Sequence, residues 1–105
     1  MATGWTQING TWFYLSSSGA MRTGWVKDGG AWYYLNGSGQ MATGWVEDGS
    51  HWYYLNPTNG KMKTGWHYED GSWYYLKPGS GQMATGRLWI VWKYYRFADN
   101  GKLIR

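Results

Sequence analysis

Short runs in which aromatic and polar residues alternate recur along the chain, and glycine-rich segments separate them. The segment 24–35 shows the pattern, because a run beginning at Trp25 is followed by a turn dipeptide and then by the aromatic run 32–35. Alternation with a period of two predicts β-strands, and Asp-Gly or Gly-Gly between two such runs predicts a tight hairpin. The pattern therefore predicts an all-β chain of two-stranded hairpins with little or no helix.

The hairpin pattern repeats at nearly constant spacing, which is typical of repeat architectures. Met-x-Thr-Gly segments recur with periods of 20, 20, 21 and 21 residues, beginning at Met1, Met21, Met41, Met62 and Met83. Residues 1–86 therefore contain four hairpin repeats and the start of a fifth, with repeat boundaries at 1–20, 21–40, 41–61 and 62–82. Residues 83–105 form a diverged C-terminal capping repeat.

Each of the first four repeats has two tryptophans seven residues apart, with turn residues between them. The dipeptides that tolerate positive φ are Asn9-Gly10, Asp28-Gly29, Asp48-Gly49 and Asp70-Gly71. In the second repeat the turn register is open by one residue, since Gly29-Gly30 fits equally well. Either register places the two tryptophans and the second tyrosine on one face, and the other face carries Val26, Tyr33 and Leu35. Because an isolated hairpin is marginal in water, we expect the hairpins to stack into a β-solenoid.

The fifth repeat departs from the pattern. Arg87 and Tyr94 replace the two tryptophans, and the segment 90–92 (Ile-Val-Trp) replaces the turn residues. Residues 88–92 are apolar on both strand faces and need cover on both sides. This pattern predicts a terminal cap or a self-association surface, and we expect a homodimer or a higher oligomer through residues 87–97.

Composition narrows the classes of function. The 105 residues include 10 Trp, 10 Tyr and 17 Gly but no Cys, so aromatics must supply much of the buried surface, and disulfides and thiolate metal sites are excluded. The dispersed net charge of +4 suits attraction to an anionic polymer. No apolar run of 18 residues could span a membrane. No signal segment precedes the first repeat, so any export signal is expected outside this chain.

The titratable residues do not predict catalysis, a cofactor or a metal site. The carboxylates lie at or beside predicted turns, where Asp is common for conformational reasons. Hairpin tips do not oppose two acids across a cleft, as a glycosidase requires. His51 and His67 lack a nucleophile or a partner at metal-ligand spacing. The chain is therefore not expected to be an enzyme.

The repeated aromatics predict a binding site instead. Two tryptophans and a tyrosine recur on one face at unchanged spacing, whereas a core usually varies its fillers from layer to layer. Aromatic faces attract cations, above all quaternary ammonium groups. No acid lies within the aromatic runs, so a cage of this kind would act through its rings alone.

These residues resemble a known family. The run Gly-Trp-Val-Lys-Asp-Gly-Gly-Ala-Trp-Tyr-Tyr-Leu-Asn of residues 24–36, with the Gly-x-Met-x-Thr-Gly-Trp that follows it, is similar to the choline-binding repeat of pneumococcal and phage cell-wall proteins. The similarity is strong over residues 1–86 and weak over 87–105. It implies a left-handed solenoid of hairpins that holds choline between consecutive hairpins, beside a Met or Leu. It also implies a non-catalytic module that binds phosphocholine on teichoic acids and anchors an attached protein at the bacterial cell-wall surface, outside the cell.

Carried over to this chain, the resemblance implies three cages, each made of two tryptophans and one tyrosine from the next repeat. They are Trp5, Trp12 and Tyr34; Trp25, Trp32 and Tyr54; and Trp45, Trp52 and Tyr75. Trp66 and Trp73 would begin a fourth cage, but Arg96 stands where its closing aromatic is expected. Because that cation opposes a cationic ligand, we expect this cage to be absent or rebuilt by Trp89 or Trp92.

Two other functions remain open at this point. Trp and Tyr also stack on sugar rings, as in the related glucan-binding repeats, so a carbohydrate-binding module fits the same pattern. The uniform first four hairpins also fit an engineered structural scaffold in which the aromatics are core.

Overall fold

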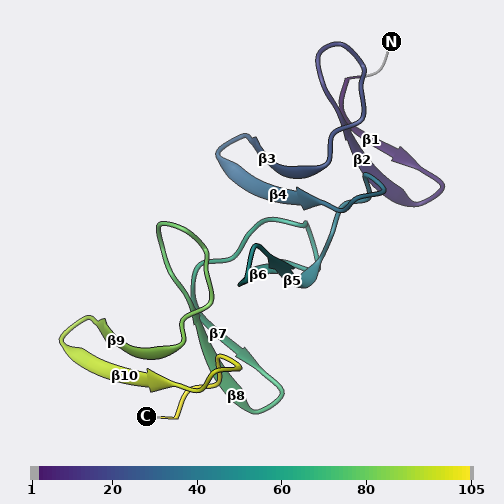
Figure 1. Ribbon diagram of the computed structural model, residues 1–105. Helices are drawn as coiled ribbons and strands as arrows, with labels where there is room; N and C mark the ends of the chain where they lie inside the picture. Colours follow the sequence, from purple (N-terminus) through teal and green to yellow (C-terminus); the bar gives the residue numbers. More distant parts are fainter. Residues whose placement is uncertain (1–2, 105) are drawn as a thin grey trace. The chain divides into compact units, whose positions relative to one another are not determined.

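The computed structural model describes residues 3–104 and shows five two-stranded antiparallel hairpins along the chain (Figure 1). The strands are β1 (Gly4–Ile8), β2 (Thr11–Leu15), β3 (Gly24–Asp28), β4 (Ala31–Leu35), β5 (Gly44–Asp48), β6 (His51–Leu55), β7 (Gly65–Glu69), β8 (Ser72–Leu76), β9 (Gly86–Ile90) and β10 (Lys93–Phe97). No helix occurs among these described residues, and so none is long and apolar enough to cross a membrane. The predicted all-β hairpin fold is confirmed.

The chain divides into two compact units. The first comprises the chain up to Val46 together with Leu55–Met62, and the second comprises Glu47–Tyr54 and the chain from Lys63 onward. The first unit contains the hairpins β1–β2 and β3–β4, and the second contains β7–β8 and β9–β10. Residues of the β5–β6 hairpin contribute to both units.

Every described hairpin turn is a two-residue loop with positive φ at both positions. Such turns match the right-handed twist of the flanking strands and favour Asn and Gly. The turn between β3 and β4 is Gly29-Gly30 rather than Asp28-Gly29, and that between β5 and β6 is Gly49-Ser50 rather than Asp48-Gly49. Asp28 and Asp48 are therefore the last residues of their strands, and their side chains are not turn residues.

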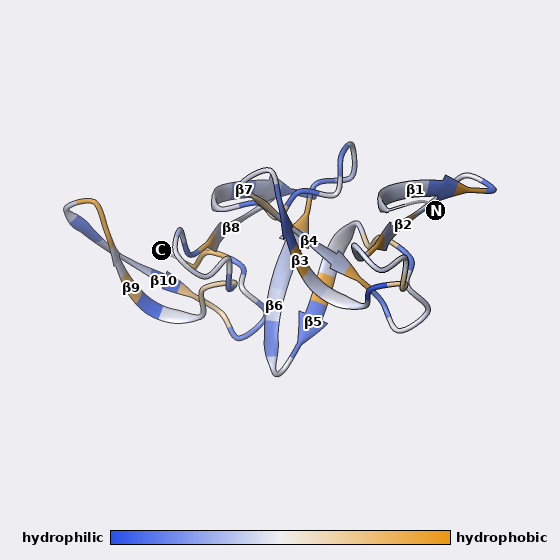
Figure 2. Ribbon diagram, turned by 90° about the horizontal axis from the view of Figure 1, so that it is seen from above, coloured by the Kyte–Doolittle hydropathy of each residue, from blue (hydrophilic) through white to orange (hydrophobic). Residues whose placement is uncertain are grey.

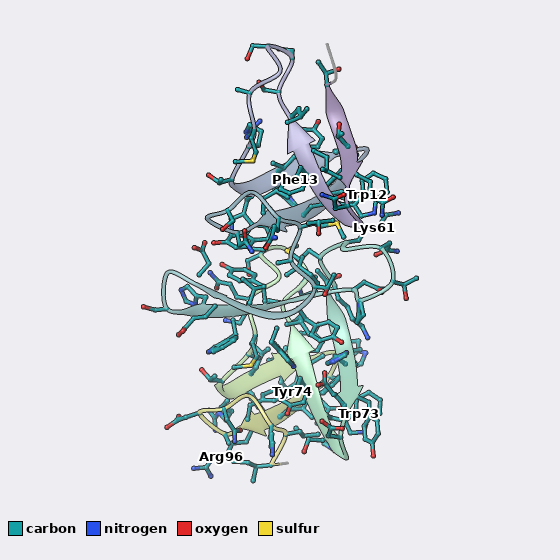
Figure 3. The ribbon with its side chains drawn as sticks, turned by 90° about the vertical axis from the view of Figure 1, so that its right-hand side faces the viewer. Trp12, Phe13, Lys61, Trp73, Tyr74 and Arg96 are labelled. Carbon is teal, nitrogen blue, oxygen red and sulfur yellow. The ribbon has the colours of Figure 1, made fainter. Side chains whose placement is uncertain are left out.

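The strand register confirms the predicted division of side chains between two faces. Trp25 pairs with Tyr34 and Val26 with Tyr33, and cross-strand partners lie on the same face. Figure 3 labels Trp73 and Tyr74, which are neighbours in sequence and lie on opposite faces of β8. The leucines that end the second, third and fourth aromatic runs belong to the core, since Leu35, Leu55 and Leu76 are all 0% exposed.

Methionines connect each hairpin to the one before it. Met41 forms a bridge with Leu35 of the preceding strand, and its N–H donates to the Trp12 carbonyl, one repeat further back, at 2.9 Å. The same long-range bond recurs from Met62 to Trp32, from Met83 to Trp52 and from Leu103 to Trp73, each at 2.8 Å. In these cases the backbone that follows a hairpin pairs both with the last strand of that hairpin and with a strand of the hairpin before it. This supplies the additional backbone pairing that an isolated hairpin lacks.

The β9–β10 hairpin keeps its two-residue turn although its sequence opposes one. Val91 and Trp92 adopt φ of 38° and 71°, which β-branched and bulky residues rarely do. Their side chains are 77% and 86% exposed, whereas Ile90 and Phe97 are buried with Ala84 in the core of the second unit. Figure 2 shows this tip as hydrophobic. The sequence predicted that the apolar segment 88–92 is covered on both faces. In the structure Ile90 is buried, whereas Val91 and Trp92 at the tip are uncovered.

Gly60→Ala is expected to destabilise the first unit, by about 1–3 kcal/mol for the backbone alone. Gly60 has φ of +76°, and a Cβ there would lie 2.6 Å from Sδ of Met41. Thermal unfolding of the variant should be compared with that of Gly37→Ala, since a Cβ at Gly37 meets nothing within 4 Å. Equal melting temperatures for the two variants would contradict this account of Gly60.

Candidate aromatic binding sites

The first aromatic site lies in the first unit and combines three repeats. The ring of Trp5 lies 6.5 Å from Trp12 in an edge-on arrangement and 4.8 Å from Tyr33 of the next hairpin. These three rings line a hollow of about 500 Å³ together with Met41 of the third repeat, and the loop residues Pro57, Thr58 and Asn59 complete the lining. Every lining residue is uncharged, so a cation in this hollow would meet aromatic faces and a thioether.

The fourth repeat builds a second site of nearly the same geometry in the second unit. Trp66 lies 6.1 Å from Trp73 and 5.0 Å from Tyr95, and Leu103 takes the place of Met41. Trp66, Trp73 and Leu103 line a hollow of about 330 Å³. The expectation that this site is absent or rebuilt is therefore not met by the geometry, because Trp89 packs on Tyr94 instead and Trp92 lies in the turn.

The other two tryptophan pairs are defined only in part. Trp25 and Trp32 lie 6.4 Å apart at an interplanar angle of 87°, which repeats the arrangement of Trp5 and Trp12. Trp45 belongs to the first unit and Trp52 to the second. The cages predicted around these two pairs stay predictions from the repeat.

The structure corrects the choice of the tyrosine that closes the first site. Tyr33 lies against Trp5, whereas the predicted Tyr34 packs at 4.9 Å against Trp25 of its own hairpin. Tyr75 likewise packs at 5.0 Å on Trp66 of its own hairpin. The reason is the stacking, because the β3–β4 hairpin presents to β1–β2 the face opposite to its own tryptophans.

The remaining predicted closing tyrosine, Tyr54, lies beside a buried histidine. Its ring is 4.0 Å from His67, which is 6% exposed and occupies the place of Val26 in its repeat. Nζ of Lys63 donates to Nδ1 of His67, and Nε2 donates to Glu69, each at 2.9 Å. Burial raises the pKa of Tyr54, and the Glu69 charge raises it further. This arrangement identifies His67 as a packed and hydrogen-bonded residue of the hairpin interior.

Asp28 has a role that the sequence did not reveal. Its carboxylate accepts a hydrogen bond from Nε1 of Trp5 at 3.2 Å. The bond therefore links the indole of Trp5 in the first repeat to the last residue of strand β3 in the second repeat. Interpreting the acids as turn residues missed this role, and the signal that would have found it is the Gly29-Gly30 register, which leaves Asp28 on the strand.

The second tryptophan of each pair remains accessible. Trp12, Trp32 and Trp52 are each 39% exposed and Trp73 is 45% exposed, although indole is the largest apolar side chain. None of these tryptophans is among the buried hydrophobic residues of the described chain, which are Val26, Leu35, Leu55, Leu76, Ala84, Ile90 and Phe97. Rings that recur at the same partial exposure favour a ligand site over a core.

The fifth hairpin offers no such pair. The Arg87 guanidinium lies 4.4 Å from the centre of the Tyr94 ring, so the two residues that replace the tryptophans contact each other. Within residues 3–104, no group of three His, Asp or Glu side chains is arranged to hold a metal ion.

Comparisons with known proteins agree with this geometry. The choline-binding repeat model matches residues 2–43, 23–65 and 42–88. The structure of CbpF in complex with ipratropium is 45% identical, with a TM-score of 0.91 over 98% of this chain and 33% of that one. CbpJ from Streptococcus pneumoniae is 46% identical, with a TM-score of 0.90 over 97% of this chain and 35% of that one.

A third similar structure is that of the pneumococcal cell-wall endolysin from phage Cp-1 complexed with choline. It is 40% identical, with a TM-score of 0.67 over 96% of this chain and 30% of that one. The chain thus spans about a third of the length of these proteins. No curated protein sequence matches significantly. On the family match and these structures, the chain belongs to the choline-binding repeat family.

Proposed function

We propose that the chain is a non-catalytic module that binds choline, or the choline group of phosphocholine, in aromatic cages formed by successive hairpins. The observation that carries this proposal is the partly exposed cage of Trp5, Trp12 and Tyr33, whose lining has no charged residue. A quaternary ammonium cannot donate hydrogen bonds, so it loses little by leaving water and gains the electrostatic attraction of three rings.

The choline groups of cell-wall teichoic acids are the natural polymer-borne form of this ligand, so the module would anchor an attached protein at the outer bacterial surface. Two observations support the proposal. The endolysin that resembles this chain is a cell-wall enzyme complexed with choline. The net charge of +4 also favours approach to a phosphate-rich polymer.

Trp12→Ala should remove or weaken one choline site. Losing one of three aromatic faces costs about 0.5–2 kcal/mol, which corresponds to roughly 2- to 30-fold weaker binding at that site. Trp92→Ala is the matched control, because Trp92 lies in the last turn outside both described cages and is 86% exposed. Isothermal titration with choline should detect one site fewer, or one weaker site, in the first variant only.

Three further measurements separate choline binding from the two alternatives, a glucan-binding module and a structural scaffold. Choline should quench tryptophan fluorescence and raise the melting temperature, since a ligand that binds only the folded state stabilises it by about 2.7 kcal/mol per site at 100 times Kd. Retention on dextran without elution by choline would favour a glucan-binding module. If neither ligand shifts the melting temperature, a structural scaffold is favoured.

We also propose that the chain forms a homodimer through residues 87–97. The support is the exposed pair Val91 and Trp92 at the tip, together with Trp89 at 53% exposure and Tyr94 at 54%. A second copy of the same apolar tip would cover these side chains. Light scattering should find a dimer at high protein concentration, and a monomer with and without choline would refute the proposal.

A further inference from the structure

A lysine distinguishes the fourth-repeat site from the first. Lys93 and Tyr95 lie on the same face of β10, and Nζ of Lys93 is 5.3 Å from the centre of the Tyr95 ring. Lys93 also lines a hollow of about 350 Å³ with Trp73, Tyr94, Tyr95 and Leu103. Trp73 and Leu103 are shared with the hollow beside Trp66, so the two hollows are adjacent.

The first site provides an internal comparison. Ala31 stands two residues before Tyr33, as Lys93 stands two residues before Tyr95. All seven residues that line the first hollow are uncharged. Among the described residues that line the two adjacent hollows of the second unit, Lys93 is the one that carries a charge. The two sites thus have matching rings but differ in charge at two equivalent positions. Lys93 stands in the place of Ala31, and Ile90 stands in the place of Asp28, whose carboxylate is bonded to Trp5 in the first site.

The charge of Lys93 acts on the two forms of the ligand in opposite directions. An ammonium group beside the cage repels a second cation and competes for the face of Tyr95, which weakens binding of free choline. A phosphate monoester carries about −1.5 to −2 charges at pH 7, so the same ammonium attracts phosphocholine. Lys93 is exposed, and the effect is therefore modest and sensitive to salt.

We propose that Lys93 makes the fourth-repeat site selective for a zwitterionic ligand, a quaternary ammonium joined to a phosphate, over free choline. The ammonium of the ligand occupies the cage of Trp66, Trp73 and Tyr95, and its phosphate lies in the adjacent hollow beside Lys93. The inference rests on the proposed function and adds a phosphate subsite to one of its cages.

The test uses one backbone amide as the reporter of each site. The N–H groups of Met41 and Leu103 donate to the carbonyls of Trp12 and Trp73, so they occupy equivalent places in the first and fourth sites. Titrations of the ¹⁵N-labelled protein with choline and with phosphocholine at low ionic strength give, at each amide, the ratio of the two dissociation constants. We expect phosphocholine to be favoured about two- to fivefold more at Leu103 than at Met41.

Reciprocal substitutions provide the controls. Lys93→Met, which keeps most of the side-chain length without its charge, should lower the ratio at Leu103 toward that at Met41 and strengthen choline binding there. The Asp28 carboxylate beside the first site has no counterpart in the fourth-repeat site, so the fall produced by this variant isolates the effect of Lys93. Ala31→Lys should raise the ratio at Met41. Lys61→Ala should change neither ratio, because Lys61 follows the loop beside the first hollow but does not line it.

Each outcome has one meaning. Equal ratios at both amides of the unaltered protein, or a ratio at Leu103 that survives Lys93→Met, would overturn the inference while leaving the choline-binding function intact. If inorganic phosphate alone shifted Leu103 at the same concentration as phosphocholine, the inference would also fail, because the cage would contribute nothing. If neither amide responds to either ligand, the proposed function itself is wrong.

Discussion

Leu35→Ala is expected to lower the free energy of unfolding by about 2–5 kcal/mol. Leu35 is 0% exposed, pairs with Gly24 across the hairpin and forms a bridge with Met41. Its loss leaves a cavity at the place where the second hairpin meets the segment that completes the first site. Choline affinity at that site should therefore fall as well, because Met41 is no longer held. Chemical denaturation with and without choline measures both effects.

Trp32→Ala is the matched control for Leu35→Ala. Indole buries more surface than a leucine side chain in an ordinary core, and its removal from a core costs about 3–5 kcal/mol. Trp32 is 39% exposed, so the ligand-site account predicts a smaller loss of stability than for Leu35→Ala, with loss of a choline site. A larger loss than for Leu35→Ala, with choline binding unchanged, would identify the tryptophans as core.

Replacing Val91-Trp92 by Asn-Gly is expected to stabilise the protein. Non-glycine residues in sparsely populated backbone regions cost of order 1–3 kcal/mol each, and Asn-Gly is the pair that forms the equivalent turn at Asn9-Gly10. A gain of even 1 kcal/mol raises the melting temperature by about 4–8 °C in a domain near this size. Calorimetry at a concentration where the chain is monomeric isolates the effect of the turn from that of association.

The reverse exchange tests the same cause. Asn9-Gly10→Val-Trp should lower the melting temperature by a similar amount, since the first turn has the same two-residue geometry. The replacement of Val91-Trp92 by Asn-Gly should also abolish dimerisation, because it removes the exposed apolar side chains of the tip. If the melting temperature does not change in either variant, the positive φ of Val91 and Trp92 costs nothing. If the dimer persists, the contact lies elsewhere.

The sequence predicted the hairpins and their faces because both follow from local rules. A period of two places Trp25 and Tyr34 on one face wherever the turn falls, and the register confirms it. The fifth repeat lacks turn residues in the segment 90–92, yet the structure forms a two-residue turn at Val91-Trp92. Pairing of the flanking strands decides the turn in that case.

The composition of the site was harder to predict, because it depends on contacts between repeats. Alternation says which residues share a face but not which face meets the next hairpin, so Tyr34 was chosen where Tyr33 lies against Trp5. The expected loss of the fourth cage followed from the same choice, since it placed Arg96 in the position that Tyr95 occupies. The bond from Trp5 to Asp28 depended on a turn register that the dipeptides left open.

The backbone hydrogen bonds from Met41, Met62, Met83 and Leu103 each reach a tryptophan carbonyl two repeats earlier. This spacing determines how the number of complete sites increases with the number of repeats. A site begun in one repeat is completed by the next two, as Trp12, Tyr33 and Met41 show. Each further repeat therefore completes one more site without altering the earlier ones. Against a polymer that carries many copies of the ligand, linked sites raise avidity by about 10²–10⁴ without any new contact. On the proposed function, cages that are individually weak would together hold the module firmly on such a polymer, while free ligand in excess would still release it.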